Sequence, residues 1–361
     1  MDLLRGRLVN QKLAGSTFRH PAEVVSWLGA VQAQDFPSAK WAIGLRATGL
    51  TEAAVERAYD QGSILRTHVL RPTWHLVAAD DIRWLVALTG PRVTARLGPR
   101  HRYLELDDRT VARSRAALTR ALQKGALTRR EAGEMLQRAR IHVTPERLTH
   151  LLVLAELEGL VCSGPLRDRQ TTYALMDQRV PAAPRVGRDE ALARLAARYF
   201  LSHGPATVAD FAWWSFLPLG DARAAIDRAG PAVPRDAVVA KAGPGRTIAR
   251  RRPSGATAWL LPDFDEFLVA YKDRSAVLGR VPIDPRDTLT HTVLIEGRAV
   301  GSWKAGRPAR LSRAAAAARP TVSVAVAPRV RLTRSDWASI RQAADRYARF
   351  LGAEVTVGEG L

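Results

Sequence analysis

The chain has 361 residues, 47 % of them hydrophobic, so it is long enough for roughly two to four domains with buried cores and is not a disordered tail. Its 55 basic and 35 acidic residues leave a net charge of +20, and almost all of the basic residues are Arg. Because the planar guanidinium of Arg binds phosphate, this composition indicates DNA as the partner. A GC-rich genome, however, also enriches Arg. The single cysteine, Cys162, excludes an internal disulfide, a four-cysteine iron–sulfur cluster and a Cys-rich zinc site. The sequence shows no signal-peptide core and no apolar run of membrane-spanning length, so we expect a cytoplasmic protein without membrane contact. With DNA as its partner, it is expected to associate with the nucleoid.

Residues 1–105 are predicted to form a first winged-helix-like unit of helices that closes on a β-hairpin. Residues 21–29 carry apolar side chains at helical spacing, and Thr51 is expected to cap a further helix. Two β-rich runs around a proline turn predict a hairpin over 64–77, and a helix over about 80–88 is expected to follow.

Residues 106–183 show the clearest pattern, which is that of a winged helix. Helices are expected over 110–124, from the capping box that Thr128 begins, and over 144–157. A two-stranded hairpin with a basic tip is expected over 160–175. Three helices followed by a hairpin is the winged-helix order.

Residues 184–253 begin the same pattern again as a third unit. The expected helices are 189–202, 207–214 and 221–229, ahead of a Pro/Gly-rich stretch. Trp213 and Trp214 in the second of these helices are expected to belong to the core. Three loosely similar units suggest tandem repetition, although their internal identity is low.

Residues 254–361 shift in composition towards strands and are expected to form an α+β part or a small β-barrel. The expected strands are 258–261, 289–295, 299–303 and 321–325. A last helix over 335–351 precedes a final short strand, and Ala314–Ala318 is interpreted as linker or helix. The predicted fold class is mostly α with β-hairpin wings: tandem winged-helix domains plus a C-terminal β-rich part.

The strongest candidate for chemistry is Gln-Ala-Gln-Asp, where a predicted helix gives way to a Pro-marked turn. Gln32 and Gln34 project from the same side of an extended segment but not of a helix, so they can act jointly only if the helix ends at about Ala30. A neutral amide donates and accepts at once and can hold a water molecule, but it is not a strong general base. The alternative is that each glutamine caps backbone groups of a buried loop. Asp35 is a tempting catalytic acid, yet it would point away from the pair and it suits the N-cap of the next helix.

The predicted hairpin brings cations and aromatic rings together. The candidates for a wedge or clamp against DNA are Arg66, Arg71, Trp74 and His75. The alternative is an ordinary strand pair with a core tryptophan. His75 is either a pH-tuned DNA contact or a hydrogen-bonded histidine.

Two further basic pairs are candidates for phosphate contacts. Arg167 and Arg169 lie at the predicted wing tip, where a solvated surface is the alternative. Lys272 and Arg274 follow the acidic run Asp263-Phe-Asp-Glu266, so this segment is either a DNA contact or a surface salt-bridge patch.

Common catalytic motifs are absent from the sequence. The chain has no Walker loop, no H-E-x-x-H and no G-x-S-x-G, and its eight histidines lack metal-ligand spacing. We therefore expect neither a metal nor a cofactor.

Several motifs together resemble those of the AlkZ/YcaQ-like winged-helix DNA glycosylases, and the resemblance covers nearly the whole chain. They are Gln-Ala-Gln-Asp, the Arg-Pro-Thr-Trp-His-Leu-Val hairpin, the stretch Leu-Leu-Pro-Asp-Phe-Asp-Glu-Phe-Leu, the later Tyr-Lys-Asp-Arg-Ser and the run that begins at His291. The resemblance implies a C-shaped array of tandem winged helices and removal of N7-alkylguanine from DNA. The YcaQ branch carries Gln-x-Asp, so Gln34 makes this chain similar to the AlkZ branch, which looks specialised for bulky or crosslinking natural-product adducts in self-resistance. Carried over, Gln32 and Gln34 are the catalytic pair.

The function that this resemblance implies is a monofunctional DNA glycosylase that acts on double-stranded DNA and leaves an abasic site. Alkylation at N7 makes the base a cation that departs as a neutral molecule, so a positioned water suffices. No lysine falls in the Gln-Ala-Gln-Asp motif, so no strand-cleaving step is expected. The protein is expected to be a monomer. The alternatives are a general glycosylase for small N-alkylpurines and a non-catalytic winged-helix DNA-binding regulator.

Overall fold

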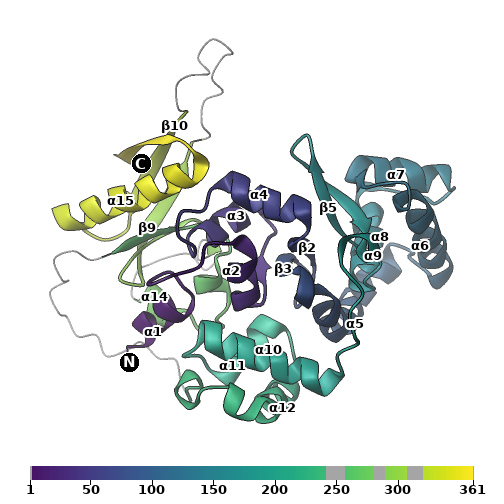
Figure 1. Ribbon diagram of the computed structural model, residues 1–361, viewed down its shortest axis with the longest axis horizontal. Coiled ribbons are helices and arrows are strands. Elements are labelled where there is room, and N and C mark those ends of the chain that lie inside the picture. The colour runs from purple at the N-terminus through teal and green to yellow at the C-terminus, as the bar shows by residue number, and fades with distance from the viewer. Residues whose placement is uncertain (1, 241–256, 280–288, 307–319, 361) are drawn as a thin grey trace.

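The computed structural model describes residues 2–240, 257–279, 289–306 and 320–360 (Figure 1). The elements of the first unit are α1 (Leu3–Asn10), α2 (Pro21–Leu28), β1 (Val31–Gln32), α3 (Phe36–Gly44), α4 (Glu52–Gln61), β2 (Ile64–His68), β3 (Trp74–Ala78) and α5 (Ala79–Tyr103). The predicted hairpin is β2–β3, and Thr51 caps α4 as predicted, since its side chain accepts the Ala54 N–H.

The backbone leaves the helical conformation where the glutamine motif begins. Gly29 follows α2 with a φ of 82°, a conformation that suits glycine because it has no Cβ. The next residues form β1, which pairs with β3 in the three-stranded sheet β1-β3-β2 and sets Gln32 opposite His75. The predicted end of the helix at about Ala30 is therefore confirmed.

Helix α5 is much longer than expected. The prediction ended it near Leu88, but it continues through Pro91 and Pro99 to Tyr103. Each internal proline removes a backbone hydrogen bond, and packing offsets that loss. A Cβ at Gly90 would lie 2.5 Å from a carbonyl oxygen of the helix α8 (Pro145–Leu157), so the two helices are in close contact along this stretch.

The second unit has the predicted order of three helices followed by a hairpin. Its elements besides α8 are α6 (Asp108–Leu122), β4 (Leu127–Thr128), α7 (Arg129–Arg138), β5 (Val161–Arg167), β6 (Gln170–Leu175) and the short α9 (Met176–Arg179). The capping box of Thr128 and Glu131 starts α7, and Thr144 caps α8. The wing strands pair in the order β4-β6-β5.

The third unit consists of α10 (Arg188–His203), α11 (Val208–Ser215) and α12 (Leu219–Ala229), which confirms the three predicted helices. Thr207 and Asp210 form the capping box of α11. After α12 come two short 3-10 helices, η1 (Gly230–Ala232) and η2 (Arg235–Ala237), and Val238 forms an isolated bridge with Ala206. Residues 241–253, the rest of the predicted unit, lie outside the described residues.

The C-terminal part is α+β. Its elements are β7 (Ala258–Leu261), α13 (Glu266–Val269), α14 (Ser275–Leu278), β8 (Thr292–Ile295), β9 (Arg298–Ala305), β10 (Thr321–Pro328), α15 (Arg334–Leu351) and β11 (Glu354–Glu359). The described strands form one sheet in the order β11-β10-β9-β8-β7. All the predicted strands and the last helix are confirmed, whereas Ala314–Ala318 lies outside the described residues.

The units share hydrophobic cores with one another. Val25 and Ile43 of the first unit share one hydrophobic core with Leu260, Trp303 and Ile340 of the C-terminal part. A second core joins the β2–β3 hairpin to α10 and α11 of the third unit. The domain boundaries proposed from the sequence therefore stay predictions.

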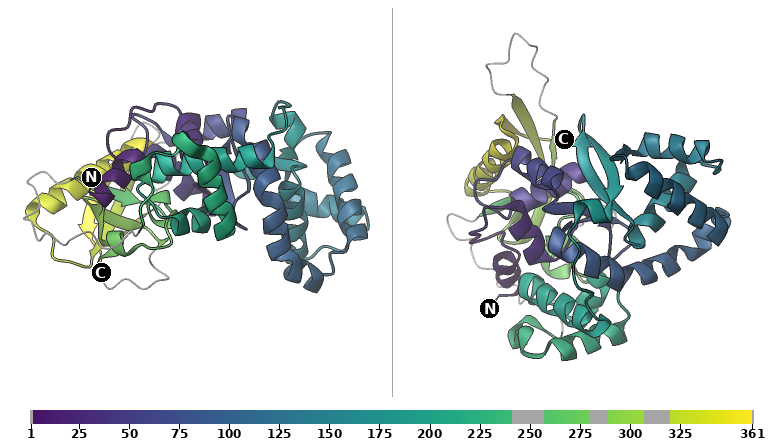
Figure 2. Two further views of the ribbon diagram at one scale, coloured as in Figure 1. Left: turned by 90° about the horizontal axis from the view of Figure 1, so that it is seen from below. Right: turned by 45° about the vertical axis from the view of Figure 1, so that its right-hand side comes forward.

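The views agree on the order of the parts in space. Helices α6–α8 and their wing occupy one end of the molecule, the C-terminal sheet with α15 occupies the other, and the first unit lies between them (Figures 1 and 2). The predicted fold class, mostly α with hairpin wings and a C-terminal β-rich part, is confirmed. Among the described residues, no helix combines the length and apolar character needed to cross a bilayer.

Candidate active site

Gln32 and Gln34 lie on an extended segment but differ in exposure. Gln32 is 7 % exposed, whereas Gln34 is exposed. Gln32 Oε1 accepts the backbone N–H of Gln34 at 3.2 Å. The buried glutamine therefore holds the backbone of the exposed one, and the Gln34 amide is open to a substrate.

Asp35 is the N-cap of α3, which confirms the capping prediction. Its Oδ2 accepts the Ser38 N–H at 2.9 Å, and Pro37 follows in the first turn. The carboxylate is thus occupied by a backbone donor of the helix, as the sequence interpretation favoured.

Arg66 holds the glutamine loop from the hairpin side. Its Nε donates to the Ala33 carbonyl at 2.9 Å, and its Nη2 lies 3.4 Å from the Gln34 carbonyl. The guanidinium stacks over the ring of Trp74, 4.4 Å from the centroid. Trp74 is only partly buried, so it is not the core tryptophan of the alternative interpretation.

His75 has no exposed surface, so its predicted role as a direct DNA contact is wrong for this structure. Its Nδ1 lies 3.0 Å from the Thr73 carbonyl and its Nε2 lies 3.4 Å from Arg71 Nη2. Burial lowers the pKa of His75 to about 3, with the charge of Arg71 as a further cause. The hydrogen-bonded histidine of the two sequence interpretations is the one observed.

Glu266 supports the glutamine loop from the C-terminal part, and the sequence analysis missed it. Its Oε1 accepts the Gln32 N–H at 3.0 Å and its Oε2 accepts the indole N–H of Trp214 at 2.9 Å. The side chain is fully buried. Burial by itself raises the pKa of Glu266, but the contact with His203 and the positive charge of Arg71 outweigh it and lower the pKa to about 2.

The surface salt-bridge interpretation of 263–266 is therefore wrong for its last two residues. Asp265 is also fully buried, where both its carboxylate oxygens accept from Arg46 Nη atoms at 2.7 and 2.8 Å. An acidic pair between the apolar runs 258–261 and 267–269 was the available signal, because a charge within an apolar stretch requires buried partners.

Lys272 and Arg274 differ in exposure. Lys272 is exposed, whereas Arg274 is partly buried and its Nε donates to the Leu268 carbonyl at 2.8 Å.

Trp214 belongs to the core, as predicted, but Trp213 is 44 % exposed, so the prediction of a core position is wrong for Trp213. Helical geometry points neighbouring side chains in different directions, and only one of the two faces the core.

The base of the wing contacts the hairpin that holds the glutamine loop. The Ser163 hydroxyl of β5 accepts the Arg66 N–H at 2.8 Å. Arg167 and Arg169 are exposed at the tip, and Arg167 is paired with Glu131. The two arginines remain candidates for phosphate contacts.

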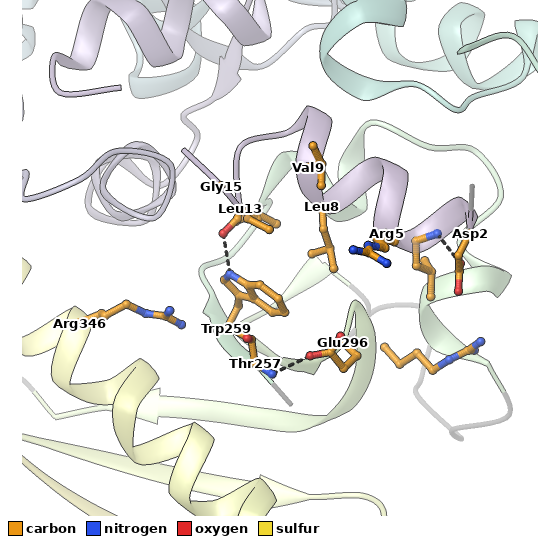
Figure 3. A pocket seen from close by; sticks show the side chains of 13 residues that line it. Asp2, Arg5, Leu8, Val9, Leu13, Gly15, Thr257, Trp259, Glu296 and Arg346 are labelled. Carbon is orange, nitrogen blue, oxygen red and sulfur yellow. Dashed lines mark hydrogen bonds between the residues drawn. The ribbon is translucent and has the colours of Figure 1, made fainter. Parts of the chain in front are cut away.

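A pocket of about 820 Å³ lies between α1 and the C-terminal sheet, lined by residues that include Leu8, Trp259 and Arg346 (Figure 3). None of the residues of the glutamine loop lines it. Among the described residues, no group of three or more His, Cys, Asp and Glu side chains is arranged to hold a metal ion.

Comparison with known proteins gives two matches. The model of the family described as "DNA glycosylase AlkZ-like" matches residues 25–350. The solved structure of Streptomyces sahachiroi DNA glycosylase AlkZ superposes with a TM-score of 0.70 at 21 % identity over 98 % of each chain, a likeness of fold. No curated protein matches the chain.

Proposed function

Because the chain belongs to the AlkZ-like DNA glycosylase family, and is therefore a DNA glycosylase, we propose that its substrate is N7-alkylguanine in double-stranded DNA and that Gln32 and Gln34 carry the reaction. The lesions are bulky or crosslinking adducts of natural products, and the role is repair in self-resistance. The observation that carries the proposal is the exposed Gln34 amide on a loop whose backbone is held by Gln32, Arg66 and Glu266.

The reaction asks little of the protein because alkylation has already activated the leaving group. A cationic N7-alkylguanine leaves with the electron pair of the C1′–N9 bond and becomes neutral. The sugar then carries positive charge, which a water oxygen neutralises as it bonds to C1′ and releases a proton to solvent. Positioning of that water by an uncharged amide supplies the catalysis.

The two glutamines take different parts in this scheme. Gln34 accepts a hydrogen bond from the attacking water, since its side chain is exposed. Gln32 sets the orientation of Gln34 through the 3.2 Å hydrogen bond to its backbone N–H. A rigid loop keeps the water aligned, because misplacement by about 1 Å can cost about 10²-fold in rate.

A strand-cleaving lyase step is not part of the proposal. Lys40, the lysine nearest the motif in sequence, is 4 % exposed, and its Nζ lies 2.6 Å from both Glu52 Oε1 and Glu56 Oε1. An amine held in two ion pairs is not available to attack C1′ as a nucleophile.

The test uses duplexes that carry either N7-methylguanine or a bulky N7 adduct, with alkali-labile sites as the readout. Gln34→Ala should lower base release by about 10²-fold or more while DNA affinity stays near that of the native protein. Gln61→Ala, at an exposed glutamine at the end of α4, is the control. Equal release by Gln34→Ala removes Gln34 from the mechanism, and preference for the methylated duplex makes small lesions the substrate.

A further inference from the structure

Trp213 is a tryptophan on the surface of α11 whose position is fixed. It is 44 % exposed, and it is the one tryptophan among the large hydrophobic side chains exposed in the described residues. Its indole N–H donates to the Val269 carbonyl at 3.1 Å, so the ring is held against α13. A fixed, exposed aromatic ring loses little conformational entropy when a partner packs against it.

The Trp213 ring is linked to the candidate active site through Val269 and Arg71. The Val269 carbonyl that accepts from Trp213 also lies 3.3 Å from Arg71 Nη1. The other Nη of Arg71 contacts His75, which pairs with Gln32 across the β1–β3 ladder. A series of direct contacts through Val269, Arg71 and His75 therefore connects the ring to the glutamine loop.

Arg274 places positive charge near the exposed ring. Arg274 Cζ lies 5.7 Å from the centroid of the Trp213 ring, and Lys272 is exposed on the same turn. The turn is held by the buried Asp210, whose Oδ1 accepts the Lys272 N–H at 2.9 Å. Asp273 is exposed within it, so the turn carries two cations against one exposed acid.

We propose that Trp213, Arg274 and Lys272 form a DNA-contact patch that packs on the backbone of one strand beside the lesion. The indole ring covers a deoxyribose or base face, and the two cations take the adjoining phosphates. An exposed aromatic ring next to basic side chains is an arrangement that recognises nucleic-acid strands. The patch requires DNA as the substrate and is independent of which guanine adduct is removed.

The first test measures the affinity of the full chain for an undamaged duplex. Trp213→Ala should weaken binding about 10-fold, whereas Trp213→Phe, which keeps a ring, should bind within about 3-fold of the native protein. DNA should quench the tryptophan fluorescence of the native chain more than that of Trp213→Phe. Tyr103→Ala is the matched control, because Tyr103 is 72 % exposed with Arg100 Cζ 4.4 Å from its centroid at the far end of α5.

The second test concerns the charge of the patch. Lys272→Gln should lower the slope of log affinity against log salt by about 0.9, the value for one phosphate contact in duplex DNA. The patch is overturned if Trp213→Ala binds like the native chain, if Tyr103→Ala loses as much affinity as Trp213→Ala, or if the salt slope is unchanged. An undamaged duplex separates these outcomes from a failure of the lesion chemistry, which leaves this binding intact.

Discussion

At the scale of single residues, the candidate active site depends on hydrogen bonds that reach the glutamine loop from distant parts of the chain. The Gln32 N–H donates to the Glu266 carboxylate, and the Gln32 side chain in turn accepts the N–H of Gln34. Arg66 of the β2–β3 hairpin donates to the loop carbonyls. The loop is thus held through its backbone, which leaves the Gln34 amide free to meet water.

Glu266→Gln should slow base release about 10- to 100-fold, with DNA affinity changed by less than about 3-fold. The carboxylate accepts from two donors, the Gln32 N–H and the Trp214 indole N–H, but an amide has one accepting oxygen and sets an NH₂ against the other donor. The measurement is the single-turnover rate alongside the dissociation constant.

Two further variants separate positioning by Glu266 from mere stability. In Glu266→Gln combined with Trp214→Phe, the competing indole donor is gone, so the amide oxygen can serve Gln32 and the rate should recover. Asp336→Asn is the matched control, since Asp336 is buried and its Oδ2 accepts two hydrogen bonds at 2.9 Å, from the N–H and the hydroxyl of Thr333 at the start of α15. A rate that falls equally in Asp336→Asn assigns the effect to stability alone.

Acid should destabilise the protein through His75. The Thr73 carbonyl can only accept, so His75 carries its proton on Nδ1, and the Nε2 lone pair accepts from Arg71. The native pKa of about 3 lies below the unfolded value, so stability present above pH 6.5 is lost as the pH falls towards 3. For Glu266 the lowered pKa gives a second loss, from about pH 4.5 down towards 2.

The loss from His75 amounts to about 2 kcal/mol between pH 7.5 and pH 5 if the unfolded pKa is about 6.5. Denaturant unfolding of the native protein and of His75→Gln at these two pH values measures it as a difference, because burial also lowers the pKa values of His203, His101 and His150. His75→Gln should flatten the pH dependence whatever its effect on absolute stability. An unchanged slope in that variant contradicts the assignment.

At the scale of elements, the N-terminus of α3 determines where the glutamine loop ends. Asp35 caps this helix in the residue directly after Gln34, so a carboxylate beside the candidate catalytic pair has a structural role. Helix α2 ends at Gly29 on the other side of the loop. The extended segment between two helix ends is therefore short and defined at both limits.

Asp35→Ala should destabilise the fold by about 1 kcal/mol, the usual cost of a lost N-cap, as measured by urea unfolding. Asp35→Asn keeps an accepting oxygen for the Ser38 N–H, so it should retain both the stability and the rate of base release. Loss of base release in a stable Asp35→Asn protein would show that the carboxylate itself is catalytic.

At the scale of the whole molecule, the C-terminal part is built into the candidate active site. Arg46 of the first unit and Asp265 of the C-terminal part form a fully buried, bidentate ion pair next to Glu266. Trp41 adds a hydrogen bond from its indole N–H to the Leu260 carbonyl at 2.8 Å. The loop and its support thus depend on the two parts folding together.

Asp265→Ala should cost about 3–5 kcal/mol, because it leaves the Arg46 guanidinium buried without its partner. Replacing both residues, as Arg46→Met with Asp265→Leu, should cost less than the single change, since no unpaired charge remains. Glu134→Ala, which breaks the exposed Arg130–Glu134 pair of α7, should cost less than about 1 kcal/mol. Thermal unfolding of the four proteins gives the comparison.

Sequence alone was sufficient for the features that local physics controls. Caps such as Thr51, Thr128 and Thr144 mark helix starts because they satisfy nearby N–H groups. The i, i+2 spacing of Gln32 and Gln34 indicated an extended loop, and the basic composition indicated DNA. These signals arise within a few residues of where they act.

Only the tertiary structure decided which polar groups are buried and which aromatic ring is exposed. Glu266 reaches Gln32 across 234 positions of sequence, and His75 is buried by the contacts of its strand with other parts of the chain. The same holds for Trp213, which is exposed although its neighbour Trp214 is core. Burial depends on which distant segments pack together, and no local pattern contains that information, because the free energy of a buried charge is determined by its partners.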